Sequence, residues 1–226
     1  MTELNEELRR QGLMPSTRDQ YLKILDRSGA DPLSWLKGRV DGRTPLGTVL
    51  PYRAAVKKYM MYVEGYTEEE AQKVLPKAKG QTTRQRFSLN PGALKDFYSA
   101  VLDVPEPYQT LLTLLPRTGL RISEACYLQR KNYIERSGVK GFLFSGKGAV
   151  QRFVPLSERA QETLDLYLAA FKPKKWLFLN RIGAPLTPAA VRKHTRAMAA
   201  KHPSLEGLSP HVLRHTFATQ AVRARS

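Results

Sequence analysis

Apolar residues recur at helical spacing through most of the first 75 residues, in short segments separated by turn residues. Asp31 before Pro32 is a typical helix start, and Thr67 followed by Glu70 forms a capping box. Ser16 is a further candidate cap, and Pro51 is expected in the first turn of another helix. One helical face would carry Tyr52, Val56, Tyr59, Met60 and Val63. The pattern predicts a small bundle of short helices.

The remainder of the chain combines helical segments with one pair of strands. Two helices are expected first, with apolar faces formed by Leu94, Phe97, Tyr98, Val101 and Leu102, and by Tyr108, Leu111, Leu112 and Leu115. The segment GFLFSGKGAVQRFVPL then has two apolar runs around a Gly-Lys-Gly turn, which indicates a β-hairpin with Lys147 at its tip. Helices after Ser157, Thr187 and Ser209 follow. The predicted fold class is mainly α with a small antiparallel β-sheet (α+β).

A basic segment separates the two patterns. Residues 76–90, PKAKGQTTRQRFSLN, contain no acidic residue and too few apolar residues to form a core. The chain of 226 residues, 42% of them hydrophobic, is long enough for two cores. We therefore predict a helical domain over residues 1–75, an interdomain linker over 76–90 and a second domain over 91–226.

The positive charge is concentrated in the linker and the second domain. The net charge is +17, and residues 76–226 supply 25 basic against 9 acidic residues, whereas residues 1–75 supply 12 and 11. Such a charge favours a polyanionic partner, and double-stranded DNA is the partner we expect. Candidate DNA-binding residues are Arg53, Lys57, Lys58, Lys77, Lys79, Arg84, Arg86 and Arg152. The linker cations also fit an ordinary solvated connector.

Other features of the sequence restrict the class of protein. No stretch approaches 18 consecutive apolar residues, and the first residues, MTELNEELRR, are charged, so neither a membrane partner nor export is expected. The single cysteine, Cys126, excludes an internal disulfide and a cysteine-rich zinc cluster. We expect a cytoplasmic protein associated with the nucleoid.

Three separated segments supply the cations that stabilise a phosphodiester in its transition state. They provide Arg121 after a glycine turn, Lys147 in the hairpin, and His211 with Arg214 three residues later on one helix face. Guanidinium groups match the geometry of phosphate oxygens with two donors each. A lysine can protonate a leaving hydroxyl, and a histidine can donate to a phosphate oxygen. Each residue alone also has an ordinary structural interpretation, and only their combination indicates a site.

The strings TGLRISEA, GKG followed by RFVPL, and LSPHVLRHTFAT resemble the tyrosine recombinase, or lambda-integrase-like (phage integrase), family. The resemblance implies that Arg121 is the first catalytic arginine, supported by Glu124, that Lys147 is the general acid, and that His211 and Arg214 form the His-x-x-Arg pair. It also implies strand cleavage through a 3′-phosphotyrosyl intermediate without a metal or another cofactor. By architecture, the first domain is similar to the family's helical core-binding (SAM-like) domain, and the second to its catalytic domain. Glu124 also fits an ordinary helix-surface carboxylate.

The nucleophilic tyrosine has no counterpart in this sequence. All ten tyrosines precede His211, the last being Tyr167. We therefore expect a C-terminally incomplete recombinase that binds DNA without cleaving it and whose homo-oligomerisation on DNA is weakened. Two alternatives stay open: a natural recombinase-derived regulator or replication factor, and a basic RNA-binding or ribosome-associated protein.

Overall fold

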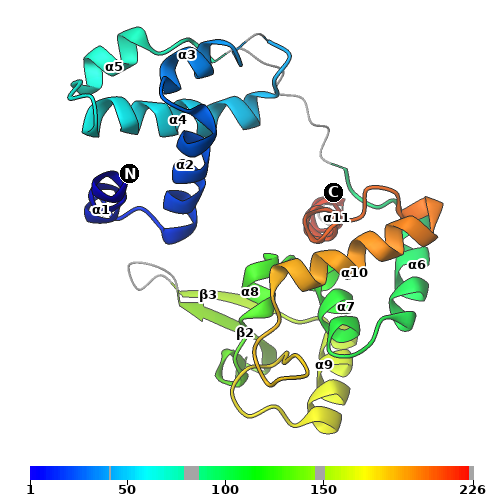
Figure 1. Cartoon of the computed structure of the whole chain (residues 1–226). Coiled ribbons are helices and arrows are strands. Elements are labelled where there is room, and N and C mark those ends of the chain that lie inside the picture. The colour runs from blue at the N-terminus through cyan, green and yellow to red at the C-terminus, as the bar shows by residue number, and fades with distance from the viewer. Residues whose placement is uncertain (41, 79–86, 146–150, 224–226) are drawn as a thin grey trace. The chain divides into compact units, whose positions relative to one another are not determined.

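The chain divides into two compact units, Met1–Arg84 and Gln85–Ser226 (Figure 1). The structure is a computed structural model that describes residues 1–40, 42–78, 87–145 and 151–223. Each unit has its own hydrophobic core. None of the helices in these parts of the chain combines the length and the apolar character needed to cross a bilayer.

The first unit is entirely helical in the residues that the structure describes. Its core includes the fully buried side chains of Leu8, Leu36 and Met60. Helix α2 packs against α4, and α1, α3 and α5 contact this pair. The helices are α1 (Thr2–Arg10), α2 (Pro15–Ser28), α3 (Pro32–Lys37), α4 (Leu46–Tyr62) and α5 (Glu68–Val74).

Two of the predicted helix starts in this unit are confirmed. The Asp31 side chain accepts a hydrogen bond from the backbone N–H of Ser34 at 2.9 Å and caps α3. At α5, Thr67 and Glu70 form both bonds of the capping box. These side chains satisfy backbone donors that have no partner within the helix.

Two other helix starts were predicted wrongly. Helix α2 begins at Pro15 with Met14 in the N-cap position, so Ser16 lies inside the helix. The fixed φ of proline suits the first helical position, and Pro15 therefore sets this boundary. Helix α4 begins at Leu46, well before Pro51. Proline has no backbone N–H, so it removes one hydrogen bond from a helix. In α4 the buried face continues on both sides of Pro51.

The second unit combines helices with one three-stranded antiparallel sheet, in the order β1-β2-β3. The predicted fold class is thereby confirmed. In the predicted hairpin, Leu143 pairs with Phe153 and Phe144 with Arg152, whereas the pairing of β1 with β2 was not predicted. The predicted hairpin tip lies in residues 146–150, outside the described residues. The elements are α6 (Pro91–Ala100), η1 (Val101–Asp103), α7 (Tyr108–Thr118), α8 (Ile122–Cys126), η2 (Arg130–Asn132), β1 (Tyr133–Arg136), β2 (Val139–Ser145), β3 (Gln151–Pro155), α9 (Glu158–Phe171), α10 (Pro188–Lys201), η4 (Pro203–Leu205) and α11 (Pro210–Arg223).

The second unit begins before the predicted domain start. Leu89 is buried in its core, and the Leu89 N–H donates to the Thr216 hydroxyl of α11 at 2.9 Å. Asn90 caps α6 through a hydrogen bond from the N–H of Ala93. Leu102, predicted on the apolar face of this helix, is 67% exposed because α6 ends at Ala100 and the chain continues as the 3-10 helix η1.

Helix α11 packs against α7 at a turn that only glycine fits well. Gly119 ends α7 in the left-handed conformation, with φ of 62°. A Cβ atom on Gly119 would overlap the ring of Phe217 on α11. Both the backbone conformation and the close approach of α11 therefore require glycine here.

We expect Gly119→Ala to lower the free energy of unfolding more than Gly138→Ala does. Gly138 also has a positive φ, but a Cβ there meets nothing within 4 Å, so its replacement carries only the backbone cost of about 1 to 2 kcal/mol. Overlap with Phe217 adds roughly 1 to 3 kcal/mol at Gly119. Urea unfolding of both variants measures the difference. Equal losses would show that α11 does not depend on this close approach.

Candidate phosphate-binding site

Arg121 stands at the N-cap of α8, directly after the turn at Gly119. Thr118, the last residue of α7, is buried, and its hydroxyl donates to the Leu114 carbonyl at 2.8 Å. The turn that precedes Arg121 is thus fixed by packing and hydrogen bonding. The Arg121 side chain itself is 62% exposed, so the fold presents a cation to solvent from a rigid turn.

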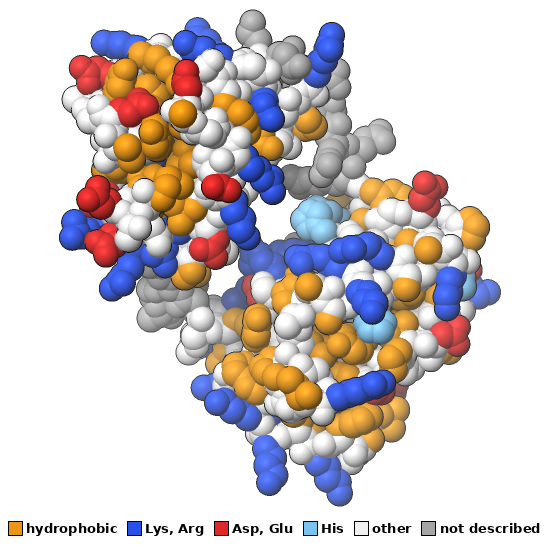
Figure 2. All heavy atoms as spheres, in the orientation of Figure 1, with side chains coloured by type: hydrophobic (Ala, Val, Ile, Leu, Met, Phe, Trp, Pro, Cys, Tyr) orange, Lys and Arg blue, Asp and Glu red, His pale blue; other side chains and the backbone are white. Residues whose placement is uncertain are grey.

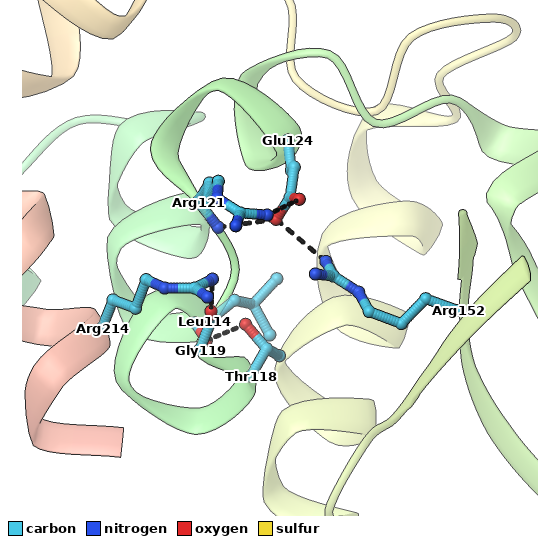
Figure 3. A network of polar contacts seen from close by, with 7 residues as sticks. All are labelled: Leu114, Thr118, Gly119, Arg121, Glu124, Arg152 and Arg214. Atoms are coloured by element: carbon cyan, nitrogen blue, oxygen red, sulfur yellow. Dashed lines mark hydrogen bonds and ion pairs between the residues drawn. The ribbon is translucent and has the colours of Figure 1, made fainter. Parts of the chain in front are cut away.

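Glu124 holds Arg121 through two contacts and also binds Arg152 (Figure 3). Its Oε2 accepts a hydrogen bond from the Arg121 backbone N–H at 2.8 Å, and its Oε1 lies 3.0 Å from Nη1 of the same residue. Oε2 also lies 2.9 Å from Nη2 of Arg152 on β3. One carboxylate therefore joins the N-terminus of α8 to two guanidinium groups.

These bonds set the charge state of Glu124. Partial burial on its own raises the pKa of this carboxyl group, but the hydrogen bonds from the Arg121 backbone, the Arg152 side chain and the Arg121 side chain outweigh that effect. The pKa of Glu124 therefore lies below its ordinary value, and the group is ionised at neutral pH.

Arg214 reaches the same turn from the other side. Its Nη1 donates a hydrogen bond to the Gly119 carbonyl, so a residue of α11 contacts the backbone two positions before Arg121. Figure 3 shows Arg121 and Arg214 beside this turn, each from its own helix. The carbonyl is a neutral partner, so the positive charge of Arg214 is not compensated by this contact. The structure thus brings two of the predicted catalytic residues to one place.

His211 lies one turn before His215 on α11, and the two imidazoles touch. Their Nε2 atoms are 2.9 Å apart, and the rings meet edge to face with centroids 4.2 Å apart. His211 is exposed. The contact between His211 and His215 was not predicted. The spacing of four residues on a predicted helix was the signal that could have shown it.

The other predicted catalytic and DNA-binding residues fall into two groups. Lys147, Lys79, Arg84 and Arg86 lie outside the described residues. In the first unit, Lys77 is exposed, while the other three cations already have partners. Arg53 donates to the Pro76 carbonyl at 3.1 Å, Lys57 pairs with Glu68 at 2.7 Å, and Lys58 donates to Gln11 at 2.7 Å.

The two units differ in surface charge. On the face shown in Figure 2, acidic and basic side chains are interspersed over the first unit, whereas Lys and Arg side chains outnumber acidic ones on the second.

Within the described parts of the chain, no three His, Cys, Asp or Glu side chains are arranged to hold a metal ion. Burial raises the pKa of Cys126 to about 12, which makes this thiol a poor nucleophile. The chemistry that this surface offers is anion binding by arginine and histidine.

A model of the phage integrase family matches residues 88–225. The match covers more than half of the chain and includes every residue of the site described above. The chain belongs to the phage integrase family. Its resemblance to tyrosine recombinases, seen first in three short motifs, is thereby confirmed.

The curated relatives that match this chain are tyrosine recombinases, and they are longer than the chain. The chain is 39% identical to tyrosine recombinase XerC of Bacillus licheniformis over 120 residues, which are 49% of the chain and 39% of the relative. It is 37% identical to XerC of Bacillus pumilus over 140 residues, 56% of the chain and 45% of the relative. It is 36% identical to XerD of Staphylococcus aureus over 119 residues, which are 49% of the chain and 39% of the relative. The chain thus spans less than half the length of these relatives.

Solved integrase and recombinase structures share the fold. A lambda integrase(75-356) dimer bound to a COC' core site matches with a TM-score of 0.73 and 18% identity, over 98% of this chain and 88% of that one. The Tn1549 transposon integrase in complex with circular intermediate DNA matches with a TM-score of 0.68 and 19% identity, over 99% of this chain and 86% of that one. At these identities the similarity establishes the fold alone.

We expect acid to remove the contribution of Glu124 to stability. A carboxyl group with a lowered pKa in the folded state stabilises the fold above its unfolded pKa and loses that effect as the pH falls through the folded value. Between about pH 6 and pH 3, wild type should therefore lose more free energy of unfolding than Glu124→Gln. Urea unfolding at each pH measures this.

Glu135→Gln is the matched control, because Glu135 is an exposed carboxylate of β1. This variant should follow the wild-type pH dependence. If Glu124→Gln also shows the wild-type pH dependence, the bonds to Arg121 and Arg152 do not hold the Glu124 carboxylate ionised.

Proposed function

We propose that this chain binds duplex DNA and holds one backbone phosphate between Arg121 and Arg214, as part of a site-specific tyrosine recombinase. In this proposal residues 91–226 belong to the catalytic domain, together with Leu89 and Asn90, which are part of the same compact unit. Residues 1–75 are the core-binding domain, and the segment between these domains, predicted over 76–90, is the linker. The observation that carries the proposal is the contact of Arg214 with the turn that presents Arg121. Two guanidinium groups on one turn match the non-bridging oxygens of a phosphate.

The remaining residues take roles around that phosphate. Glu124 orients Arg121, and His211, an exposed imidazole of the same helix as Arg214, donates to a phosphate oxygen. Lys147, in the segment between β2 and β3, is the general acid for the leaving 5′-hydroxyl. The support is the family match over residues 88–225, which includes each of these residues, and the names of the curated relatives.

Strand cleavage needs a nucleophile that these 226 residues do not supply at the family's position. No tyrosine follows Arg214. Tyr167, the last one, is buried, its hydroxyl donates to the Leu177 carbonyl at 2.9 Å, and burial raises its pKa to about 12. A buried phenol with a raised pKa is a poor nucleophile. We therefore propose that these 226 residues by themselves bind DNA without cleaving it.

The charge distribution supports DNA as the partner over a neutral or acidic one. The linker and second domain carry 25 basic and 9 acidic residues, and such a surface gains affinity by displacing counterions from a nucleic-acid backbone. The structural relatives named above include the Tn1549 transposon integrase in complex with circular intermediate DNA. Homo-oligomerisation on DNA, weaker than in a full-length family member, and a cytoplasmic, nucleoid-associated location belong to the same proposal.

We expect duplex affinity to fall steeply between about 50 and 200 mM salt, with the slope set by the number of phosphates that the protein neutralises. Replacing Arg84 and Arg86 by glutamine should lower that slope by about one unit for each phosphate that is no longer neutralised. Fluorescence anisotropy with a labelled duplex measures both quantities.

The control is the double variant Arg9→Gln and Arg10→Gln in α1, which removes the same charge from a helix rich in acidic residues. It should leave the slope unchanged. An unchanged slope in the Arg84 and Arg86 variant would assign these residues to a solvated connector. Tighter binding to structured RNA than to duplex DNA would favour the RNA-binding alternative.

Incubation with a nicked suicide substrate should yield no covalent protein–DNA adduct on a denaturing gel. The reason is that none of the ten tyrosines stands after Arg214, where the family places its nucleophile. An adduct mapped by peptide mass spectrometry to any of these tyrosines would overturn the assignment of binding without cleavage.

A further inference from the structure

Arg152 is the least expected member of the site. It was predicted as a DNA contact from its charge alone, yet its guanidinium points to Glu124 of α8, with Nη2 at 2.9 Å from Oε2 (Figure 3). The same guanidinium lies over the ring of Phe144, its partner on β2, at 5.1 Å from the ring centroid. A carboxylate and an aromatic face therefore hold this side chain inside the protein's own network.

The side chains of Arg121 and Arg152 contact different oxygens of Glu124. An isolated arginine and carboxylate commonly pair through two parallel hydrogen bonds. Here the Arg121 guanidinium contacts Oε1, at 3.0 Å, while Oε2 accepts hydrogen bonds from Nη2 of Arg152 and from the Arg121 backbone N–H. These two bonds use both acceptor positions of Oε2. The rest of the Arg121 fork stays available, and its side chain is 62% exposed.

We propose that Arg152 is a positioning residue of the phosphate site: by occupying Oε2 of Glu124 it keeps Arg121 in a one-point ion pair with its remaining donors directed to phosphate. This inference rests on the proposed function, in which Arg121 and Arg214 bind a phosphate. Arg152 itself does not contact the phosphate.

The charges of the cluster support this role. One carboxylate between two guanidinium groups leaves the group of three residues with a net positive charge, which favours an anion beside Arg121. Without Arg152, Glu124 compensates Arg121 one to one, and the acceptor position on Oε2 that Arg152 occupied becomes available to the Arg121 guanidinium, while the bond from the Arg121 backbone N–H remains. Arg121 is then held by an internal anion in competition with the phosphate.

The test is binding of inorganic orthophosphate to the intact chain, followed by NMR chemical shifts at low salt. Arg152→Gln should weaken orthophosphate binding by about tenfold, the size of one charge-assisted hydrogen bond. Arg152→Lys, which keeps the charge but cannot form the planar fork, should lie between this variant and wild type. Arg136→Gln, which removes an exposed arginine of β1 in the same sheet, is the matched control and should bind as wild type does.

The decisive comparison repeats Arg152→Gln in a Glu124→Gln background. Because Arg152 acts through Glu124, its replacement should have no further effect on orthophosphate binding once the carboxylate is gone. A tenfold loss in both backgrounds would overturn the inference, since a direct phosphate contact or a general loss of charge or fold persists without Glu124. An effect of Arg152→Gln no larger than that of Arg136→Gln would also overturn it.

The two proposals fail in different ways. If wild type binds neither orthophosphate nor duplex DNA, the proposed function is wrong, and the proposed role of Arg152 is wrong as well. If wild type binds both and the Arg152 variants behave as Arg136→Gln does, the proposed function stands and the positioning role alone is wrong.

Discussion

The close approach of α11 to the turn at Gly119 is the constraint on which the site depends. A glycine in the left-handed conformation ends α7, and the ring of Phe217 occupies the space where any other side chain would begin. The approach brings Arg214 onto the Gly119 carbonyl and so places it beside the residue that starts α8. Two cations separated by more than ninety positions in the chain thereby share one small region of the surface.

The partners of these two cations determine how much of their positive charge remains available to bind an anion. The second unit contains many more basic than acidic residues, so each internal carboxylate has a strong effect on its neighbours. Glu124 fixes the N-terminus of α8 and binds two arginines, while Arg214 has a carbonyl partner that leaves its charge intact. The arrangement keeps positive charge at the turn without leaving the arginines loose, as a preorganised anion site requires.

Much of this organisation followed from the sequence because it depends on local signals. Capping residues such as Asp31 and Thr67 located helix starts, and the apolar runs around Gly-Lys-Gly located the hairpin. The motifs around Arg121 and Arg214 identified the family. Each signal is contained within a few neighbouring residues, where backbone geometry and side-chain chemistry are directly linked.

What the sequence did not predict depends on tertiary packing. The bond between Arg152 and Glu124 joins residues 28 positions apart, and nothing in their local pattern distinguishes Arg152 from a solvated arginine. The pairing of β1 with β2 and the burial of Leu89 against α11 also arise from long-range contacts. Pro51 inside α4 shows that a buried helical face can outweigh a local interruption.

A crystal structure of the chain bound to duplex DNA would show whether Arg121 and Arg214 share one phosphate. We expect the guanidinium groups of both arginines to donate to the oxygens of a single backbone phosphate, with Glu124 still bound to Arg121. A complex in which the two arginines contact different phosphates, or in which neither contacts DNA, would contradict it.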